Sequence, residues 1–294
     1  MTDVGTVAAT GPGPVCPHPI PRPFMRQRWD DVAFAHWPVP REVVAALLPS
    51  PLVPDCHAGS AWVSLVTFTM RSLRITHMPP IPTTRDFAEV NVRTYVTGPD
   101  GPGVWFCSLD APSMLPVLVA RTLYGLPYCV ADVRRTGGND GRGWRIARRW
   151  PDRSTGRLVV ERLDTSADDD LATFLTARWR LYAGTRLTRV ARIEHEPWPL
   201  RHARVLDCDT GLMRAAGFAA EGAPISHWAS GVSVRAGAPK RLHRPSGWPR
   251  RAATRGPSPF RALESSTESC CGAIADTTER QAEERVTEPE QPLE

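Results

Sequence analysis

The stretch Phe87-Ala88-Glu89-Val90-Asn91-Val92-Arg93-Thr94-Tyr95-Val96-Thr97 decides how this sequence folds. Successive side chains of a β-strand point to opposite faces, so every second residue shares a face. One face is that of a protein core, with Ala88, Val90, Val92, Thr94 and Val96. The other face is mostly polar, with Phe87, Glu89, Asn91, Arg93, Tyr95 and Thr97. The pattern predicts a strand with one apolar face and one polar face.

The polar face of this strand fits two environments. A strand at the surface shows the same alternation, with its polar side in water. The next run, 103–110, is apolar on both of its faces, with Val104 and Phe106 alternating with Trp105, Cys107 and Leu109. A strand beside such a neighbour is expected to be covered on both sides, which would place Glu89 and Arg93 in a cavity. Buried charges require partners, so this cavity is a candidate binding site.

Short apolar runs separated by turn signals continue on both sides of this pair. The turn sequence Gly98-Pro99-Asp100-Gly101 predicts a hairpin between the two strands. Further strands are expected over 32–37, 61–73, 128–135, 143–150, 158–163, 178–183, 186–195, 203–206 and 227–234. Short helices are expected over 40–48, 112–124 and 168–175. This pattern predicts an α+β, mostly β fold with a closed or nearly closed antiparallel sheet.

Composition divides the 294 residues into three regions. Residues 1–25 are rich in Gly and Pro, and residues 240–294 carry a basic and then an acidic segment, so both are expected to be disordered. Residues 26–239 have periodic apolar patterns and are predicted to form one domain. No run approaches the ~20 apolar residues of a membrane span, and no secretory signal is recognised. We therefore expect a cytoplasmic protein without a membrane partner.

Charge and cysteine content argue against several functional classes. The net charge of +5 includes 36 basic residues, of which only Lys240 is a lysine. This excess of arginine is typical of codon bias in a GC-rich genome, and no nucleic-acid motif accompanies it, so no nucleic-acid partner is expected. The seven cysteines are widely spread without a CxxC pair. Reduced thiols are predicted, with no metal and no cofactor.

Five runs of the sequence resemble, in this order, the hallmark runs of the DUF2071 (YqjF-like) family. They are Phe-Ala-His-Trp-Pro-Val-Pro (34–40), Glu-Val-Asn-Val-Arg-Thr-Tyr-Val (89–96), Gly-Val-Trp-Phe-Cys-Ser-Leu-Asp (103–110), Leu-Thr-Ala-Arg-Trp-Arg-Leu-Tyr (175–182) and His-Glu-Pro-Trp-Pro-Leu (195–200). The resemblance spans about residues 28–236. That family is similar to acetoacetate decarboxylase, whose strand-rich sheet closes around a pocket. The resemblance implies the same architecture here.

The resemblance also implies where decarboxylase chemistry would lie. Acetoacetate decarboxylase forms a Schiff base through a lysine of depressed pKa beside a second lysine. These two positions fall on Tyr128 and Cys129, whereas Glu89 matches the family's pocket carboxylate and Leu109-Asp110 its Leu-Asp pair. Arginine cannot substitute, because its guanidinium stays protonated. Schiff-base decarboxylation is therefore not expected unless Lys240 enters the pocket.

The polar groups left in the expected pocket are Glu89, Arg93, Tyr95, Asp110 and Tyr128. A carboxylate facing an arginine and a phenol could orient a small organic acid or carbonyl compound, so the first hypothesis is small-molecule binding. The second is a lysine-independent enzyme of the hydratase, isomerase or lyase type, with Glu89 as acid/base and Arg93 as anion anchor. The third is an interaction protein that acts through its charged tail. Homo-oligomer formation is left open.

Each candidate also has a structural interpretation. Glu89 and Arg93 could form an ion pair, Tyr128 could be a core aromatic residue, and Asp110 could cap the helix that follows it. Glu194-His195-Glu196 looks like an activated histidine, but strand alternation turns both acids away from the ring, so a structural role is predicted. Cys129 could be a nucleophile if His36 or His227 came near.

Overall fold

The computed structural model of the protein describes residues 13–76, 86–112, 124–136, 141–184 and 187–243. The helices are α1 (Arg41–Leu47), α3 (Asp170–Thr176) and α4 (Gly211–Ala215). The strands are β1 (Met25–Val39), β2 (Val53–Pro54), β3 (Ala61–Ile75), β4 (Phe87–Gly98), β5 (Gly101–Ala111), β6 (Tyr128–Thr136), β7 (Arg142–Trp150), β8 (Thr155–Ser166), β9 (Arg180–Ala183), β10 (Arg189–His195), β11 (Leu200–Asp209), β12 (Ile225–Ala236) and β13 (Lys240–Arg241).

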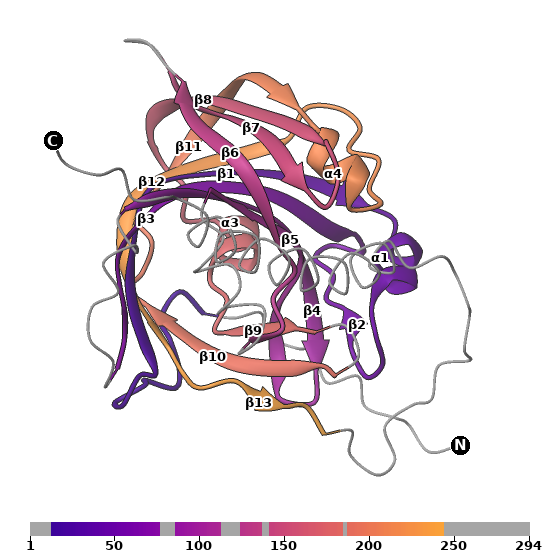
Figure 1. Cartoon of the computed structure of the whole chain (residues 1–294), viewed down its shortest axis with the longest axis vertical. Coiled ribbons are helices and arrows are strands. Elements are labelled where there is room, and N and C mark those ends of the chain that lie inside the picture. The colour runs from indigo at the N-terminus through magenta and orange to yellow at the C-terminus, as the bar shows by residue number, and fades with distance from the viewer. Residues whose placement is uncertain (1–12, 77–85, 113–123, 137–140, 185–186, 244–294) are drawn as a thin grey trace, which may run out of the picture. The chain divides into compact units, whose positions relative to one another are not determined.

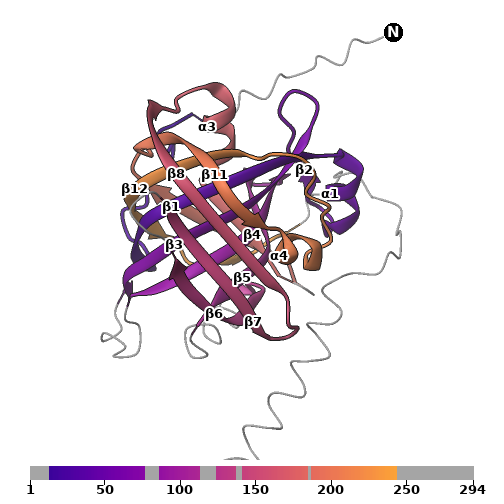
Figure 2. The same ribbon diagram turned by 90° about the horizontal axis from the view of Figure 1, so that it is seen from above.

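These strands form one sheet that closes on itself twice. The strands β12, β1, β3, β4 and β5 make a shared wall. From this wall, β6, β7, β8 and β11 complete one closed circuit, here called ring A, and β9 and β10 complete a second, ring B. Figure 1 shows the two rings on either side of the wall, and Figure 2 shows α3 at one edge of the molecule. The predicted mostly β fold with a closed sheet is confirmed.

Two strand pairs depart from the predicted antiparallel arrangement. Strand β5 runs parallel to β6 and also to β9. Parallel neighbours require a long crossover, and the 16 residues between β5 and β6 are long enough for one. The sheet is therefore mixed, with β5 as the strand from which the two rings diverge.

Each ring contains its own hydrophobic core. Ring A is filled by side chains such as Trp37, Val92, Trp105, Trp144 and Leu158. Ring B is filled from the opposite face of the wall, by residues that include Phe34, Phe68, Tyr95, Phe106 and Phe174. Residues 89–96 of β4 are all buried, which confirms that this strand is covered on both sides.

A bulge in the β4–β5 hairpin changes which side chains face each ring. Val92 pairs with Ser108 but Arg93 pairs with Phe106, so Cys107 is an extra residue of β5. Strict alternation along 103–110 predicted that Asp110 would share a face with Phe106. After the bulge, it is Leu109 that packs in the ring B core with Phe106. Asp110 therefore points to ring A, opposite to Glu89.

Most predicted elements are present with different bounds. The strand expected over 32–37 extends to all of β1, and the one expected over 203–206 to all of β11. Helix α1 follows Pro40, and α3 begins after Asp169, whose side chain accepts a hydrogen bond of 2.7 Å from Ala172 N. Residues 113–123 of the helix expected over 112–124 lie outside the described residues. Helix α4 and the short strands β2 and β13 were not predicted.

The two short helices α1 and α4 both supply residues to the ring A core. Val44 and Leu48, in and just after α1, pack in the same cluster as Leu212 and Met213 of α4. Figure 2 shows both helices toward the same end of ring A. Helix α3 instead packs against ring B, with Phe174 and Leu175 buried in the ring B core. The buried side of α3 therefore contributes directly to the surroundings of the polar face of β4.

Parts of the two predicted terminal regions contact β10. The Ile20 N–H donates to Glu194 at 2.6 Å, and β13 pairs with Val190 and Arg189. The predicted disorder of residues 1–12 and 244–294 concerns positions outside the described chain. Within the described part, no helix is long and apolar enough to cross a membrane.

Candidate functional site

The polar face of β4 forms a buried row inside ring B. Glu89, Asn91 and Arg93 are 3%, 3% and 7% exposed, and Tyr95 is fully buried. Alternation along the strand points all four side chains away from the ring A core, which Val90 and Val92 join. Four of the five predicted site residues are thus in ring B, because Tyr128 of β6 also packs in its core.

Glu89 is held by Tyr128 and not by Arg93. The Tyr128 hydroxyl donates to Glu89 Oε2 at 2.8 Å. Burial raises the pKa of Glu89 to about 8; the Tyr128 hydrogen bond opposes this shift and the charge of Asp110 adds to it. Glu89 is therefore a neutral acid at pH 7. Four residues of strand span about 13 Å, which explains why the alternative of a Glu89–Arg93 ion pair is not realised.

Arg93 carries a buried charge without a carboxylate partner in the described chain. One terminal nitrogen donates to the Leu175 carbonyl at 3.0 Å, while Nε is buried without a hydrogen-bond partner there. The guanidinium lies 5.6 Å from the centre of the Phe34 ring and 5.8 Å from that of Tyr95. The two aromatic side chains and the one carbonyl only partly compensate the loss of hydration of the Arg93 charge. The Asn91 Oδ1 atom is likewise buried without a partner.

Tyr95 joins Arg93 to a histidine. Its hydroxyl donates to the same Leu175 carbonyl at 2.8 Å and lies 2.6 Å from Ser64 Oγ. Ser64 in turn lies 2.7 Å from His36 Nδ1. Burial lowers the pKa of His36 well below its usual value, helped by the charges of His227 and Arg93. His36 is therefore neutral at physiological pH.

Two further histidines of this region are also neutral. Burial first, and then the charge of His202, lower the pKa of His227 to about 4. Burial likewise lowers that of His195 to about 4. The rings of His36 and His227 are 5.3 Å apart. No group of three or more potential metal ligands of the His, Cys, Asp and Glu types comes together in the described residues.

A second buried arginine, Arg178, was not predicted as a site residue although it lies in a recognised run. It pairs with Asp55, and its guanidinium lies 4.1 Å from the ring centre of Phe174 and 4.9 Å from that of Tyr95. Arg178 thus has the carboxylate partner that Arg93 lacks. Sequence alone does not distinguish the two, because Asp55 is 123 residues away along the chain.

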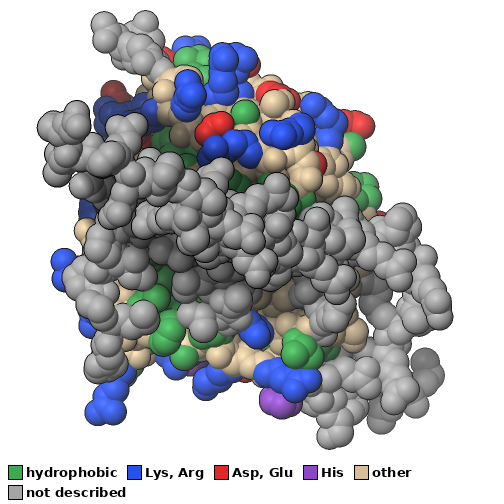
Figure 3. Space-filling view, viewed as in Figure 1, with side chains coloured by type: hydrophobic (Ala, Val, Ile, Leu, Met, Phe, Trp, Pro, Cys, Tyr) green, Lys and Arg blue, Asp and Glu red, His purple; other side chains and the backbone are tan. Residues whose placement is uncertain are grey.

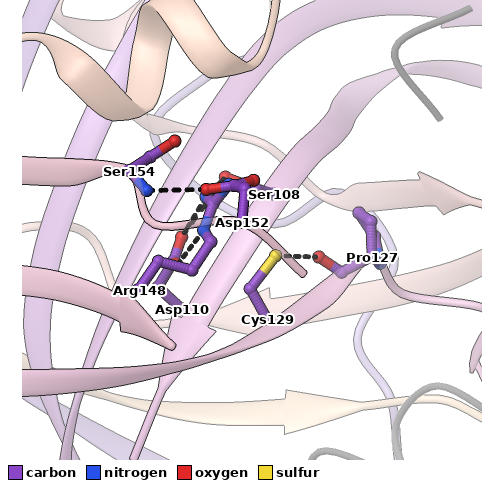
Figure 4. Close-up of polar contacts among 7 residues, drawn as sticks. All are labelled: Ser108, Asp110, Pro127, Cys129, Arg148, Asp152 and Ser154. Atoms are coloured by element: carbon purple, nitrogen blue, oxygen red, sulfur yellow. Dashed lines mark hydrogen bonds and ion pairs between the residues drawn. The ribbon is translucent and has the colours of Figure 1, made fainter. Parts of the chain in front are cut away.

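Asp110 belongs to a separate ion pair on the ring A side. Arg148 donates from Nε to Asp110 Oδ1 at 2.7 Å and from a terminal nitrogen to Oδ2 at 2.9 Å, and it also reaches Asp152 and Ser108 (Figure 4). Both partners are buried, at 0% and 4% side-chain exposure. Asp110 is therefore not grouped with the other four candidates, and no pattern in the sequence indicated Arg148 as its partner.

The remaining candidates fall outside the ring B row. Cys129 lies between Tyr128 and Val130, which both pack in ring B, so alternation turns its thiol away from His36 and His227. Lys240 is exposed on β13. Glu194 accepts from Ile20 and pairs with Arg235, while His195 Nδ1 contacts the Glu196 carbonyl at 2.7 Å. A surface hollow of about 460 Å³, lined by residues 38–42 and 59–60, contains none of the predicted site residues.

The outer surface of ring A is rich in arginine. Figure 3 shows Lys and Arg side chains over this region with acidic side chains among them. Arg142 pairs with Asp31, and Arg204 pairs with Glu161. Much of this positive charge is therefore locally compensated. The absence of a nucleic-acid partner stays a prediction.

Comparison with solved structures supports this architecture. An acetoacetate decarboxylase-like enzyme from Sphingomonas wittichii RW1 matches with a TM-score of 0.53 at 13% identity, over 76% of this chain and 95% of that one. Acetoacetate decarboxylase from Legionella pneumophila matches with a TM-score of 0.53 at 11% identity, over 78% and 92%. The enduracididine biosynthesis enzyme MppR, complexed with pyruvate, matches with a TM-score of 0.52 at 14% identity, over 76% and 91%. At these identities the likeness shows the fold alone.

Comparison of sequences identifies the family of the chain, which the structural matches do not. The uncharacterized protein YqjF of Bacillus subtilis (strain 168) is 38% identical over 217 residues, which cover 72% of this chain and 89% of YqjF. The profile of DUF2071, described as an uncharacterized conserved protein, matches residues 26–233. The chain therefore belongs to the DUF2071 family and has an acetoacetate decarboxylase-like fold.

Proposed function

We propose that the protein binds a small organic acid inside ring B, with its anionic group at Arg93. The observation that carries this proposal is the buried Arg93 guanidinium, which has no carboxylate at ion-pair distance in the described chain. Glu89 does not neutralise it, since that side chain is uncharged at pH 7. A bound carboxylate would supply the missing charge and could accept from the unpartnered Nε.

The structural relatives support the size and class of this ligand. MppR, as its structures are titled, has been complexed with pyruvate and with the condensation product of pyruvate and imidazole 4-carboxaldehyde. Acetoacetate decarboxylase is named for a small oxo acid. A small acid, with or without a carbonyl group, is therefore the ligand class that we assign to the interior of ring B.

Schiff-base chemistry is not part of this proposal. The one lysine of the chain, Lys240, is exposed on β13, and the resemblance to acetoacetate decarboxylase implies that the two lysine positions of that enzyme correspond to Tyr128 and Cys129. A phenol and a thiol cannot form an iminium ion with a ketone.

A second candidate function is acid/base catalysis on the bound acid. It is favoured by Glu89, a buried carboxyl whose pKa of about 8 lies close to physiological pH. Catalysis of hydration or isomerisation would use the same Arg93 anchor, and it requires a substrate that extends along the about 13 Å of strand between Arg93 and Glu89. The interaction-protein alternative depends on the charged tail, which lies almost wholly outside the described residues.

The test is ligand binding to the purified full chain. Native mass spectrometry identifies any retained ligand, and thermal shifts are then measured with pyruvate, acetoacetate, lactate and 3-hydroxybutyrate. A ligand at 100 times its Kd should stabilise the protein by about 2.7 kcal/mol. Arg93→Met should abolish the shift, whereas Arg145→Met, at an exposed arginine of β7, should retain it. No shift with any acid, or the same shift in Arg93→Met, would contradict the proposal.

A further inference from the structure

A chain of three hydrogen bonds fixes which nitrogen of His36 carries the proton. The contacts run from His36 Nδ1 to Ser64 Oγ at 2.7 Å, from Ser64 to the Tyr95 hydroxyl at 2.6 Å, and from Tyr95 to the Leu175 carbonyl at 2.8 Å. The Tyr95 hydroxyl also lies 3.3 Å from His36 Nδ1, and once Tyr95 donates to Leu175 its oxygen can only accept from this nitrogen. A carbonyl oxygen only accepts, so Tyr95 must donate to Leu175. Tyr95 then accepts from Ser64. The single hydroxyl hydrogen of Ser64 is used in this bond to Tyr95. Ser64 can therefore only accept from His36, so the Nδ1 atom of His36 carries the proton.

The opposite direction of donation is unfavourable in this setting. If Ser64 donated to His36 Nδ1, no hydrogen would lie between the two oxygens that are 2.6 Å apart. Two lone pairs would then face each other in a buried site, where such repulsion is not screened by water. His36 is neutral and has a single N–H, so the other ring nitrogen, Nε2, is a bare acceptor.

This bare acceptor lies close to the anion anchor. His36, Ser64 and Arg93 are directly paired across β1, β3 and β4, so the three side chains form one row on the ring B face. The Phe34 ring lies 5.8 Å from the His36 ring and 5.6 Å from the Arg93 guanidinium. His36 Nε2 and Arg93 Nε are both buried without a hydrogen-bond partner in the described chain. The row therefore offers an acceptor on one side of Ser64 and a charged donor on the other, with the Phe34 ring near both.

We propose that this row selects a hydroxy acid over the matching oxo acid, with the carboxylate at Arg93 and the hydroxyl donating to His36 Nε2. The proposal rests on the proposed function and names its substrate class. A ligand hydroxyl satisfies the acceptor, whereas the carbonyl oxygen of an oxo acid meets it lone pair to lone pair. Sites built to hydrogen-bond a ligand hydroxyl reject analogues that lack this group strongly.

Tyr95 is then a specificity-determining residue that acts through Ser64 and His36. In Tyr95→Phe, the Ser64 hydrogen is no longer needed by the phenol and can turn to His36 Nδ1. The imidazole proton then moves to Nε2, which becomes a donor. A donor at His36 Nε2 favours the carbonyl oxygen of an oxo acid. Loss of the Tyr95 hydroxyl should therefore shift the binding preference toward the oxo acid.

The experiment uses three matched pairs: lactate with pyruvate, 2-hydroxybutyrate with 2-oxobutyrate, and 3-hydroxybutyrate with acetoacetate. Calorimetry on the full chain should give at least tenfold tighter binding of the hydroxy acid in at least one pair, and Tyr95→Phe should reduce this ratio tenfold or reverse it. ¹⁵N NMR of histidine-labelled protein, with His36→Gln to assign the signal, should show a neutral His36 protonated at Nδ1. Ser64→Ala, which removes the acceptor for Nδ1–H, should also reduce the ratio.

The outcomes separate this inference from the proposed function. Equal affinities within every pair, or tighter oxo acids in the unmodified protein, overturn the hydroxy-acid assignment while acid binding stands. A His36 protonated at Nε2 overturns the hydrogen-bond argument even if Tyr95→Phe fails to fold. No binding of any of the six acids overturns the proposed function and this inference together.

Discussion

The Tyr128 hydroxyl donates a hydrogen bond of 2.8 Å to Glu89 inside ring B. These two residues come from β6 and β4, on opposite sides of β5, and their contact keeps the Glu89 carboxyl away from Arg93. Glu89 is uncharged near neutral pH, so the positive charge of Arg93 has no internal counterion in the described chain. Burial of Glu89, against the opposing effect of the Tyr128 hydrogen bond, thus explains why Glu89 can act as an acid, and its neutral state explains why ring B favours an anion.

The pH dependence of stability should report the state of Glu89. Its pKa is about 8 in the fold and near 4.5 when unfolded, so between these values the folded state binds more protons. Stability contributed by the neutral carboxyl is then present below pH 4.5 and lost as the pH rises to 8, by up to about 1.4 kcal/mol per pH unit. Glu89→Gln should lack this loss. Urea unfolding of the unmodified protein and of Glu89→Gln at pH 5, 6.5 and 8 measures this difference. If the free energy of unfolding changed equally with pH in both proteins, the pKa of Glu89 would be ordinary.

Arg93→Met should separate binding from folding. The substitution removes a buried charge that lacks a carboxylate partner, together with one hydrogen bond to Leu175. We expect the free energy of unfolding without ligand to change by less than about 2 kcal/mol, while stabilisation by small acids disappears. Denaturant curves with and without acid measure both, with Arg145→Met as the matched control. A much larger loss without ligand would mark Arg93 as a structural residue.

Asp110→Asn should destabilise the protein without changing acid binding. Arg148 would keep only Asp152 as a carboxylate partner, and breaking a buried ion pair costs about 3–5 kcal/mol. Asp110 points to ring A, so acid binding at Arg93 should be unchanged, while the pKa of Glu89 loses the raising effect of the Asp110 charge. The double variant Asp110→Asn/Arg148→Met should recover at least half of the loss, because no buried charge is left behind. Additive losses in the double variant would show that the two residues act independently.

Borohydride treatment with acetoacetate should leave no adduct at an internal side chain. Reduction traps an iminium ion between a ketone and a lysine, and Lys240 is exposed on β13 whereas Glu89 and Tyr128 are buried. Intact mass and peptide mapping measure any added mass, and Lys240→Met provides the control. A stoichiometric adduct on Lys240 would reinstate Schiff-base chemistry.

The sequence by itself determined the strand-rich class, the two covered faces of β4 and the chemistry of its polar row. These follow from period-two alternation and from an apolar neighbour, which are local properties. It also placed Glu89, Arg93, Tyr95 and Tyr128, which all reach ring B. The presence of a single lysine, Lys240, was likewise visible in the sequence alone.

Only the tertiary structure decided how these groups are paired. The bulge at Cys107 turned Asp110 to ring A, and bulges depend on the register of two strands and not on one strand's pattern. Arg148 reaches Asp110, Asp55 reaches Arg178, and Ser64 links His36 to Tyr95, all across long sequence separations. Hydrogen bonds and ion pairs act over about 3 Å, so their partners are set by how the sheet closes. The sequence supplied the polar groups, and closure of the two rings decided that Arg93 has no carboxylate partner among the described residues.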